Sequence, residues 1–125
     1  MNELRIAGTT STPTIHCTSV PPCVRLQGDS YPENAFELYQ PLMHWLQAHL
    51  DAADTTLRME LELVYLNTSS VRVMMDVFDL LEEAHRSGKS VSVRWYYDPR
   101  NERVAELAEE FKEDLSLPFE ILPHP

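Results

Sequence analysis

The stretch Tyr65-Leu66-Asn67-Thr68-Ser69-Ser70 joins an alternating segment on its N-terminal side to a long, mostly apolar segment on its C-terminal side. Alternation with a period of two is typical of a strand, and apolar residues spaced three and four apart are typical of a helix. Asn, Thr and Ser are favoured N-cap residues, worth about 1 kcal/mol, so one of them is expected to cap this helix. The first N–H groups of a helix also favour an anion, so a phosphate on one of the three hydroxyls would be tolerated.

The segments on either side of this joint have clear periods. Residues 57–66 predict a strand with one buried and one wet face, because apolar side chains alternate with Arg58, Glu60 and Glu62. Residues 71–86 predict a mostly buried helix that ends before Gly88, since few of them are polar. The narrow polar stripe of this helix consists of Arg72, Asp76, Asp79, Glu83 and Arg86.

The rest of the chain predicts further strands and helices. Residues 14–18 and 23–27 predict an antiparallel hairpin around Val20-Pro21-Pro22. Residues 33–50 predict a helix that either kinks at Pro41 or starts near Gln40. The remaining expected elements are a strand over residues 90–97, a helix over residues 104–115 and a short strand over residues 119–122.

This order predicts an α/β protein with a mixed sheet of four to five strands, including an N-terminal β-hairpin. Helices placed between strands favour parallel pairing through right-handed crossovers, and the hairpin adds an antiparallel edge. Half-polar strands indicate three main helices largely on one face. Residues 1–13 are expected to form a mobile arm, and residues 14–125 a single domain.

The composition narrows the expected partners and location. The chain has 125 residues, and its 20 acidic and 10 basic residues give a formal net charge of -10. That charge repels phosphate backbones and anionic lipid, so neither nucleic acid nor a membrane is an expected partner. No apolar run approaches the roughly 20 residues of a membrane span, and residues 1–7 lack the pattern of a signal peptide. The protein is therefore expected to be cytoplasmic.

Neither the cysteines nor the histidines predict a metal site. Cys17 and Cys23 could face each other across the hairpin, but two cysteines are a thin framework for a chain of this length, so free thiols are expected. The five histidines form no His-x-x-x-His pair, and no Cys-x-x-Cys occurs. No metal and no cofactor is therefore expected.

Nothing in the sequence has the pattern of a catalytic site. Adjacent or alternate carboxylates fall on faces predicted to be solvated. Ser69 and Ser70 lack a Gly-x-Ser-x-Gly context, and three glycines leave no phosphate-binding loop. His44, Trp45 and His49 could line a small pocket, although packing of the first helix explains them more simply. We therefore expect that the protein is not an enzyme.

The joint resembles the phosphorylation segment of STAS-type anti-sigma factor antagonists. Residues 64–71 complete a strand and open a helix where those proteins carry Asp-Ser-Ser-Gly. Thr68 falls on their modified serine, while Asn67 stands for the aspartate and Ser70 for the glycine. The resemblance implies a STAS-like fold and, as one alternative, an antagonist that binds an anti-sigma kinase and controls transcription.

Four blocks, one of them the joint itself, together resemble the SiaC family of biofilm regulation phosphoproteins, and the likeness covers nearly the whole chain from Gly28 onward. The blocks are Gly28-Asp29-Ser30-Tyr31-Pro32-Glu33-Asn34, Tyr65 to Ser70, Phe78-Asp79-Leu80-Leu81-Glu82-Glu83-Ala84-His85 and Arg100-Asn101-Glu102-Arg103-Val104-Ala105-Glu106-Leu107. Four separate blocks make this resemblance the more specific of the two.

This second resemblance implies a phosphorylation-dependent switch between partners. A Ser/Thr protein kinase would phosphorylate Thr68, and a PP2C-type phosphatase would remove the phosphate. The unphosphorylated protein would bind a GGDEF-domain diguanylate cyclase and promote synthesis of cyclic di-GMP. Partner contacts are expected beside the joint, at Tyr31, Pro32, Glu33, Asn34, Asn67, Ser69, Ser70 and Arg72. Two alternatives remain: the first four of these form only a helix-entry loop, or the chain is a small-molecule-binding α/β domain.

Overall fold

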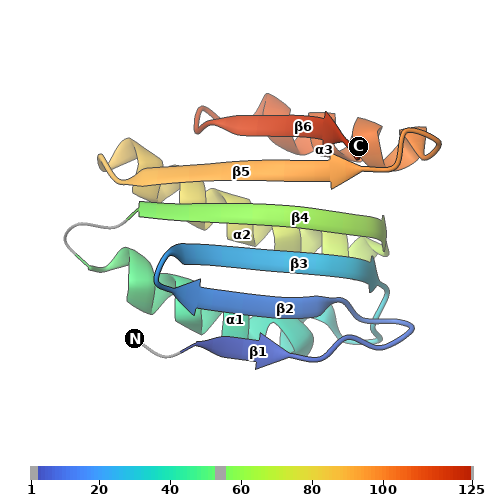
Figure 1. Cartoon of the computed structure of the whole chain (residues 1–125), viewed down its shortest axis with the longest axis horizontal. Coiled ribbons are helices and arrows are strands. Elements are labelled where there is room, and N and C mark those ends of the chain that lie inside the picture. Colours follow the sequence, from blue (N-terminus) through green and yellow to red (C-terminus); the bar gives the residue numbers. More distant parts are fainter. Residues whose placement is uncertain (1–2, 53–55, 125) are drawn as a thin grey trace.

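The structure is a computed structural model and describes residues 3–52 and 56–124. Residues 1–2, 53–55 and 125 lie outside these ranges. The first residues of the expected arm (1–13) and the last residue of the expected domain (14–125) are therefore outside the described residues. The elements in chain order are β1 (Leu4–Ile6), β2 (Thr14–Ser19), β3 (Pro22–Ser30), α1 (Ala35–Leu50), β4 (Thr56–Leu66), α2 (Thr68–Arg86), β5 (Ser90–Tyr97), α3 (Glu102–Glu113) and β6 (Phe119–Pro123) (Figure 1).

The described strands form one mixed sheet of six, in the order β1-β2-β3-β4-β5-β6. β1, β2 and β3 pair antiparallel, whereas β3, β4, β5 and β6 pair parallel. One helix joins each parallel pair, and Figure 1 shows all three helices behind the sheet. Right-handed crossovers between successive neighbours place every helix on the same face. The predicted α/β class with three helices is confirmed, but the prediction of four to five strands is wrong.

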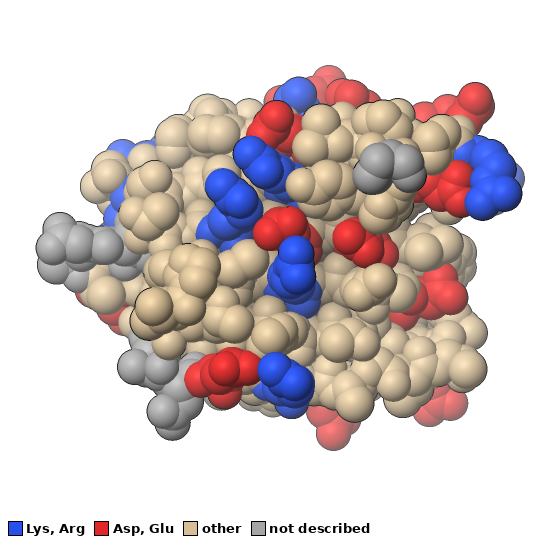
Figure 2. Space-filling view, in the orientation of Figure 1, with Lys and Arg blue, Asp and Glu red and all other residues tan. Residues whose placement is uncertain are grey.

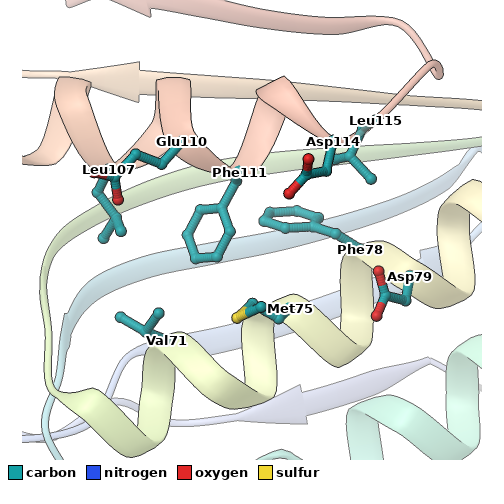
Figure 3. Close-up of a pocket in the computed structure, with 9 residues that line it drawn as sticks. All are labelled: Val71, Met75, Phe78, Asp79, Leu107, Glu110, Phe111, Asp114 and Leu115. Carbon is teal, nitrogen blue, oxygen red and sulfur yellow. The ribbon is translucent and has the colours of Figure 1, made fainter.

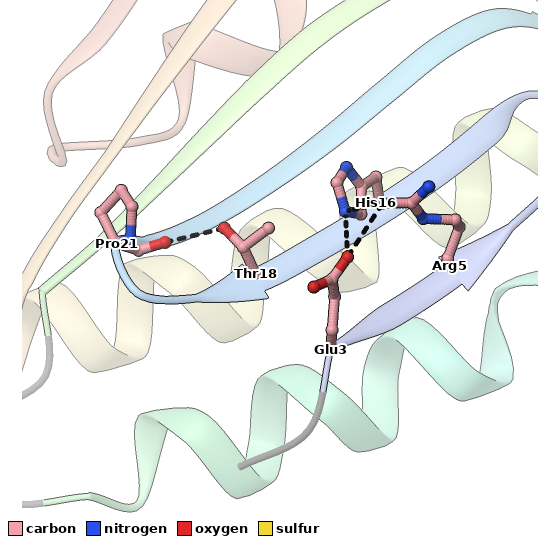
Figure 4. Close-up of polar contacts among 5 residues, drawn as sticks. All are labelled: Glu3, Arg5, His16, Thr18 and Pro21. Atoms are coloured by element: carbon pink, nitrogen blue, oxygen red, sulfur yellow. Dashed lines mark hydrogen bonds and ion pairs between the residues drawn. The ribbon is translucent and has the colours of Figure 1, made fainter.

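The additional strand is β1, at the edge of the sheet. The sequence predicts no strand within residues 1–13, but Leu4–Ile6 pairs with β2. Glu3 adds a polar contact, because its Oε1 lies 2.7 Å from His16 Nε2 and 3.0 Å from the guanidinium of Arg5 (Figure 4). A strand of three residues is too short to show alternation, so its pairing could not be recognised from the pattern.

The hairpin of β2 and β3 places its two cysteines on opposite faces of the sheet. Cys17 pairs with Val24, whereas Cys23 pairs with Thr18, and successive positions along a strand point to opposite sides. Cys17 is fully buried, and burial raises the pKa of its thiol to about 12. Cys23 is half-buried, with its Sγ 3.6 Å from Glu60 Oε1. Both cysteines are free, as predicted.

α1 starts before its proline. Asn34 caps the helix, since its side chain accepts a hydrogen bond from the Glu37 N–H at 3.1 Å. Pro41 lies inside the helix with its ring exposed. The sequence allows a helix that includes Pro41 or one that starts near Gln40. The structure has the first, and a start near Gln40 is wrong.

Aromatic side chains fill the core beneath α2 and α3. The ring centroid of Phe78 lies 5.0 Å from that of Phe111, 5.4 Å from Phe119 and 6.4 Å from Trp95. Aromatic pairs at such distances add about 0.5–1.5 kcal/mol beyond the area they bury. These rings hold α2 and α3 on the sheet, although the two helix backbones stay farther apart than those of α1 and α2.

The face of the sheet turned away from the helices is polar and carries alternating charges. The register places Arg25, Glu60, Arg94 and Glu120 in one row across β3 to β6. Arg25 lies 3.7 Å from Glu60, Arg94 lies 3.1 Å from Glu120, and Figure 2 shows basic beside acidic side chains on this face. Exposed pairs contribute only about 0–1 kcal/mol each, but they neutralise each other locally. This face is therefore not where the net negative charge is concentrated.

Glu82 on α2 fixes the loop that connects α3 to β6. It is 7% exposed, and its Oε1 accepts hydrogen bonds from the N–H groups of Ser116 and Leu117 at 2.9 and 3.0 Å. Its Oε2 accepts from the Ser116 hydroxyl at 2.6 Å and from Arg86 Nε at 3.0 Å. These hydrogen bonds, that of the Ser116 hydroxyl first, outweigh burial and lower the pKa of Glu82 to about 2.

Glu82→Gln is expected to lower the free energy of unfolding at neutral pH by about 2 kcal/mol, because a charged acceptor binds these donors more strongly than an amide does. Folding lowers the pKa of Glu82 from 4.5 to about 2, so the stabilisation is complete above pH 4.5 and is lost as the pH falls through about 2. Urea unfolding at about pH 7, 4 and 3 measures the effect, with the exposed Glu83→Gln as control. Equal losses in the two variants near pH 7 would contradict the prediction.

Candidate functional site

Asn67 holds the loop from β4 into α2. Its Oδ1 accepts hydrogen bonds from the Ser70 N–H at 2.9 Å and from the Ser69 hydroxyl at 3.2 Å, which makes Asn67 the N-cap of α2. Its Nδ2 donates to the Pro32 carbonyl at 2.9 Å, and its backbone N–H donates to the Ser30 carbonyl at 2.9 Å. The side chain therefore ties the start of α2 to the loop between β3 and α1.

Ser70 lies behind this cap and is fully buried. Its hydroxyl is 2.7 Å from that of Ser30, which is in turn 2.6 Å from the hydroxyl of Tyr39. Burial raises the pKa of Tyr39 to about 12, so its phenol stays protonated and can donate within this chain of three hydroxyls. The sequence suggests a direct partner contact for Ser70, but its buried side chain is not accessible to a partner.

Thr68 is the first residue of α2, and it is exposed. Within residues 3–52 and 56–124, its hydroxyl has no hydrogen-bond partner. Ser69 is half-buried and bonded to Asn67, and Ser70 is buried and bonded to Ser30. Among the three hydroxyls of the joint, only that of Thr68 is therefore both exposed and uncommitted.

Exposed apolar side chains surround this end of the molecule. Tyr31 is 44% exposed and Tyr65 is 55% exposed, and their rings meet edge to face with centroids 5.9 Å apart. Phe36 on the first turn of α1 is 68% exposed, and Met75 on α2 is 52% exposed. Aromatic residues and methionine are enriched at protein interfaces. The exposed apolar groups thus favour a protein partner at the end of the sheet where β4 meets α2.

The other predicted partner residues differ in how they relate to the joint. Tyr31 and Pro32 lie beside the joint, through the ring contact with Tyr65 and the hydrogen bond from Asn67. Asn34 serves mainly as the cap of α1. The remaining two, Glu33 and Arg72, are exposed, and neither forms an ion pair with another residue that the structure describes.

Sequence reasoning missed Phe36 and gave no surface role to Met75. Phe36 breaks the apolar period of α1, because it falls between the buried Ala35 and the half-buried Leu38 on a different side of the helix. An apolar residue off the buried stripe was the available signal. Met75 offered no such signal in the sequence, because its spacing matches that of the apolar residues of α2.

The pocket considered for His44, Trp45 and His49 is not formed by these three together. Trp45 and His49 are buried and stack with centroids 4.9 Å apart, whereas His44 is exposed. Burial lowers the pKa of His49. These side chains pack α1, which was the simpler interpretation.

Neither a cluster of metal-ligating side chains nor a membrane-spanning helix is found among the residues that the structure describes. No group of three or more His, Cys, Asp or Glu side chains there could hold a metal ion. None of the three helices is long and apolar enough to cross a membrane.

Comparison with known proteins gives the class of protein to which this chain belongs. A family model described as SiaC family regulatory phosphoprotein matches residues 6–124. The chain is also 53% identical over 124 residues to an uncharacterized protein of Pseudomonas aeruginosa (strain UCBPP-PA14), covering 99% of this chain and 98% of that protein. These matches define a regulatory phosphoprotein. The chain belongs to the SiaC family, as its four sequence blocks predict.

Solved structures agree closely with this fold. SiaC of Pseudomonas aeruginosa is 51% identical with a TM-score of 0.94, and the match covers 99% of this chain and 100% of that one. The crystal structure of apo-SiaC gives 52% identity and a TM-score of 0.94 over 98% of this chain and 99% of that one. The crystal structure of the diguanylate cyclase SiaD in complex with its activator SiaC from Pseudomonas aeruginosa contains a chain that is 54% identical with a TM-score of 0.94. That match covers 97% of this chain and 99% of the other.

The hydroxyl chain at the joint predicts unequal effects of two small substitutions. Ser30→Ala leaves both the Tyr39 and the Ser70 hydroxyls buried without their partner, at a cost of about 3 kcal/mol in the free energy of unfolding. Ser70→Ala leaves Ser30 bonded to Tyr39 and costs about 1 kcal/mol. Chemical denaturation measures both, with Ser69→Ala as a half-buried control. A larger loss for Ser70→Ala than for Ser30→Ala would contradict this arrangement.

Proposed function

We propose that this protein is a non-catalytic, cytoplasmic partner switch that binds and activates a GGDEF-domain diguanylate cyclase. Phosphorylation of Thr68 by a Ser/Thr protein kinase releases the cyclase, and a PP2C-type phosphatase restores binding. The family supports a regulatory phosphoprotein, and the relative SiaC is the activator of the cyclase SiaD. Cyclic di-GMP synthesis, and through it biofilm formation, is then the process under control.

The exposed, uncommitted hydroxyl of Thr68 is the observation that carries this proposal. A phosphate there adds about -1.5 to -2 charges but displaces no hydrogen bond of the cap, which Asn67 forms. The N-terminus of α2 favours an anion by about 0.3–2 kcal/mol. The phosphorylated protein can therefore keep its fold, so the modification acts on binding.

Release follows from the cost of covering a phosphate. A partner that lies over Tyr31, Tyr65 and Thr68 must remove water from any charge at that position. Burying an uncompensated phosphate costs several kcal/mol, whereas about 2.7 kcal/mol weakens binding a hundredfold. One covalent change thus separates the bound from the free protein.

The contact surface in this proposal comprises the exposed and half-buried residues around the joint. Tyr31, Pro32, Glu33, Asn34, Asn67, Ser69 and Arg72 offer side chains or loop backbone to the partner. Ser70 acts from beneath by fixing the start of α2. The STAS-like resemblance makes an anti-sigma factor antagonist the alternative that the same experiment tests.

Thr68→Ala is expected to remain folded, to accept no phosphate from the kinase and to bind the cyclase constitutively. Wild type treated with kinase and ATP should lose cyclase binding by about a hundredfold or more. Intact-mass analysis with peptide mapping locates the phosphate, and pull-down with an assay of cyclic di-GMP synthesis measures the function. Ser69→Ala is the control for the site of modification alone: it leaves Thr68 and the cap of α2 in place, so it should still take up one phosphate at Thr68.

Two outcomes would refute the proposal. Phosphate on Ser69 with Thr68 unmodified would remove Thr68 as the switch. Capture of an anti-sigma kinase alone, without a cyclase, by Thr68→Ala would favour control of transcription.

A further inference from the structure

A shallow groove of about 250 Å³ lies between α2 and α3. Val71 and Met75 on α2 face Leu107 and Phe111 on α3, and Figure 3 shows these apolar side chains pointing toward one another. Phe78 and Phe111, whose ring centroids lie 5.0 Å apart, both line it. Its volume is below the roughly 300–1,000 Å³ of ligand pockets, which suits side chains of a protein better than a small molecule.

Carboxylates line the groove, and two of them mark one end. Asp79 and Asp114 lie at the end away from Val71 and Leu107, whereas Glu110 extends from α3 toward Leu107 (Figure 3). The lining includes no Lys or Arg. None of the three acids forms an ion pair within the described ranges. Unpaired like charges of this kind are complementary to a cationic partner.

The groove lies on the same side of α2 as Thr68. Thr68, Val71, Met75 and Asp79 are spaced three, four and four residues apart, which places them along one side of α2. Thr68 itself does not line the groove, so a bound segment would have to extend about one helical turn beyond Val71 to reach it. Met75, which is 52% exposed, lies between the two ends.

The neighbouring groove between α1 and α2 lacks this charge pattern. It has a similar volume of about 270 Å³, and Phe36 and Met43 line it. Asp76 is its single carboxylate among the lining residues. Charge complementarity therefore selects the groove between α2 and α3.

We propose that the groove between α2 and α3 binds a segment of the partner that has apolar side chains along one face and Lys or Arg at one end. The apolar residues pack on Met75 and Phe111, and the cationic end lies over Asp79 and Asp114. The inference rests on the proposed function, because the partner is the cyclase whose binding Thr68 controls.

Charge reversal at the acidic end tests the inference. Unphosphorylated Asp79→Lys/Asp114→Lys protein is titrated against SiaD of Pseudomonas aeruginosa by calorimetry. The matched control is Glu109→Lys/Glu113→Lys, which makes the same change in net charge on exposed residues outside the groove. We expect the groove variant to bind at least about tenfold more weakly than wild type, and the control to stay within about twofold. Asp79→Asn, which removes one negative charge without adding a cation, should weaken binding by about threefold. It tests the same contact if the double variant does not fold.

The outcomes separate this inference from the proposed function. Equal affinities of the groove variant and the control, with wild type still binding SiaD and Thr68 phosphorylation still releasing it, would overturn the groove assignment alone. Failure of unphosphorylated wild type to bind SiaD would overturn the proposed function and the inference with it. Affinity of wild type that falls with added salt, together with a smaller salt effect in the groove variant, supports the inference.

Discussion

The hydrogen bond from Asn67 Nδ2 to the Pro32 carbonyl joins the two loops on which the site depends. β3 and β4 are parallel neighbours, so their C-terminal ends lie side by side, and each strand is followed there by a helix. The register shifts between Gly28 and Ser30, and the positive φ of 119° at Gly28 is a conformation that glycine adopts without strain. The shift places Ser30 beneath the cap, where its carbonyl and its hydroxyl both bond to the start of α2. The exposure of Thr68 is a consequence of that attachment.

Four consecutive residues at this joint have separate physical tasks. Asn67 satisfies the helix start, Ser70 anchors it to the core and Ser69 supports the cap. Thr68 contributes no bond to the joint among the described residues, so it is the one position where a bulky anion disturbs no native contact. A cap and the proposed switch are therefore compatible here, because different side chains would perform the two roles.

Local pattern was enough to predict the joint, the strand before it, the helix after it and the α/β class, because each depends on periodicity over ten or more residues. Three features depend on tertiary contacts and could not be predicted. β1 is defined only by its pairing with β2. Ser69 and Ser70 have the same side chain, and only the position of Ser30 buries one of them. The groove is lined by residues of α2 and α3 that lie far apart in the sequence, and only their packing on the sheet brings them together.

The proposed binding of a cationic segment at the acidic groove has to be compatible with phosphorylation, since a phosphate on Thr68 would add negative charge to the same side of α2. Asp79 lies eleven residues beyond Thr68, which is about 16 Å along the helix. Screening at physiological ionic strength acts over about 8 Å, so the phosphate changes the attraction at the Asp79 end very little. At the Thr68 end its effect would be local, because a partner that covers the phosphate has to remove water from it. In the proposed complex, attraction and rejection would therefore act at opposite ends of one contact: the acidic end would select the partner, and the phosphorylation of Thr68 would decide whether it stays bound.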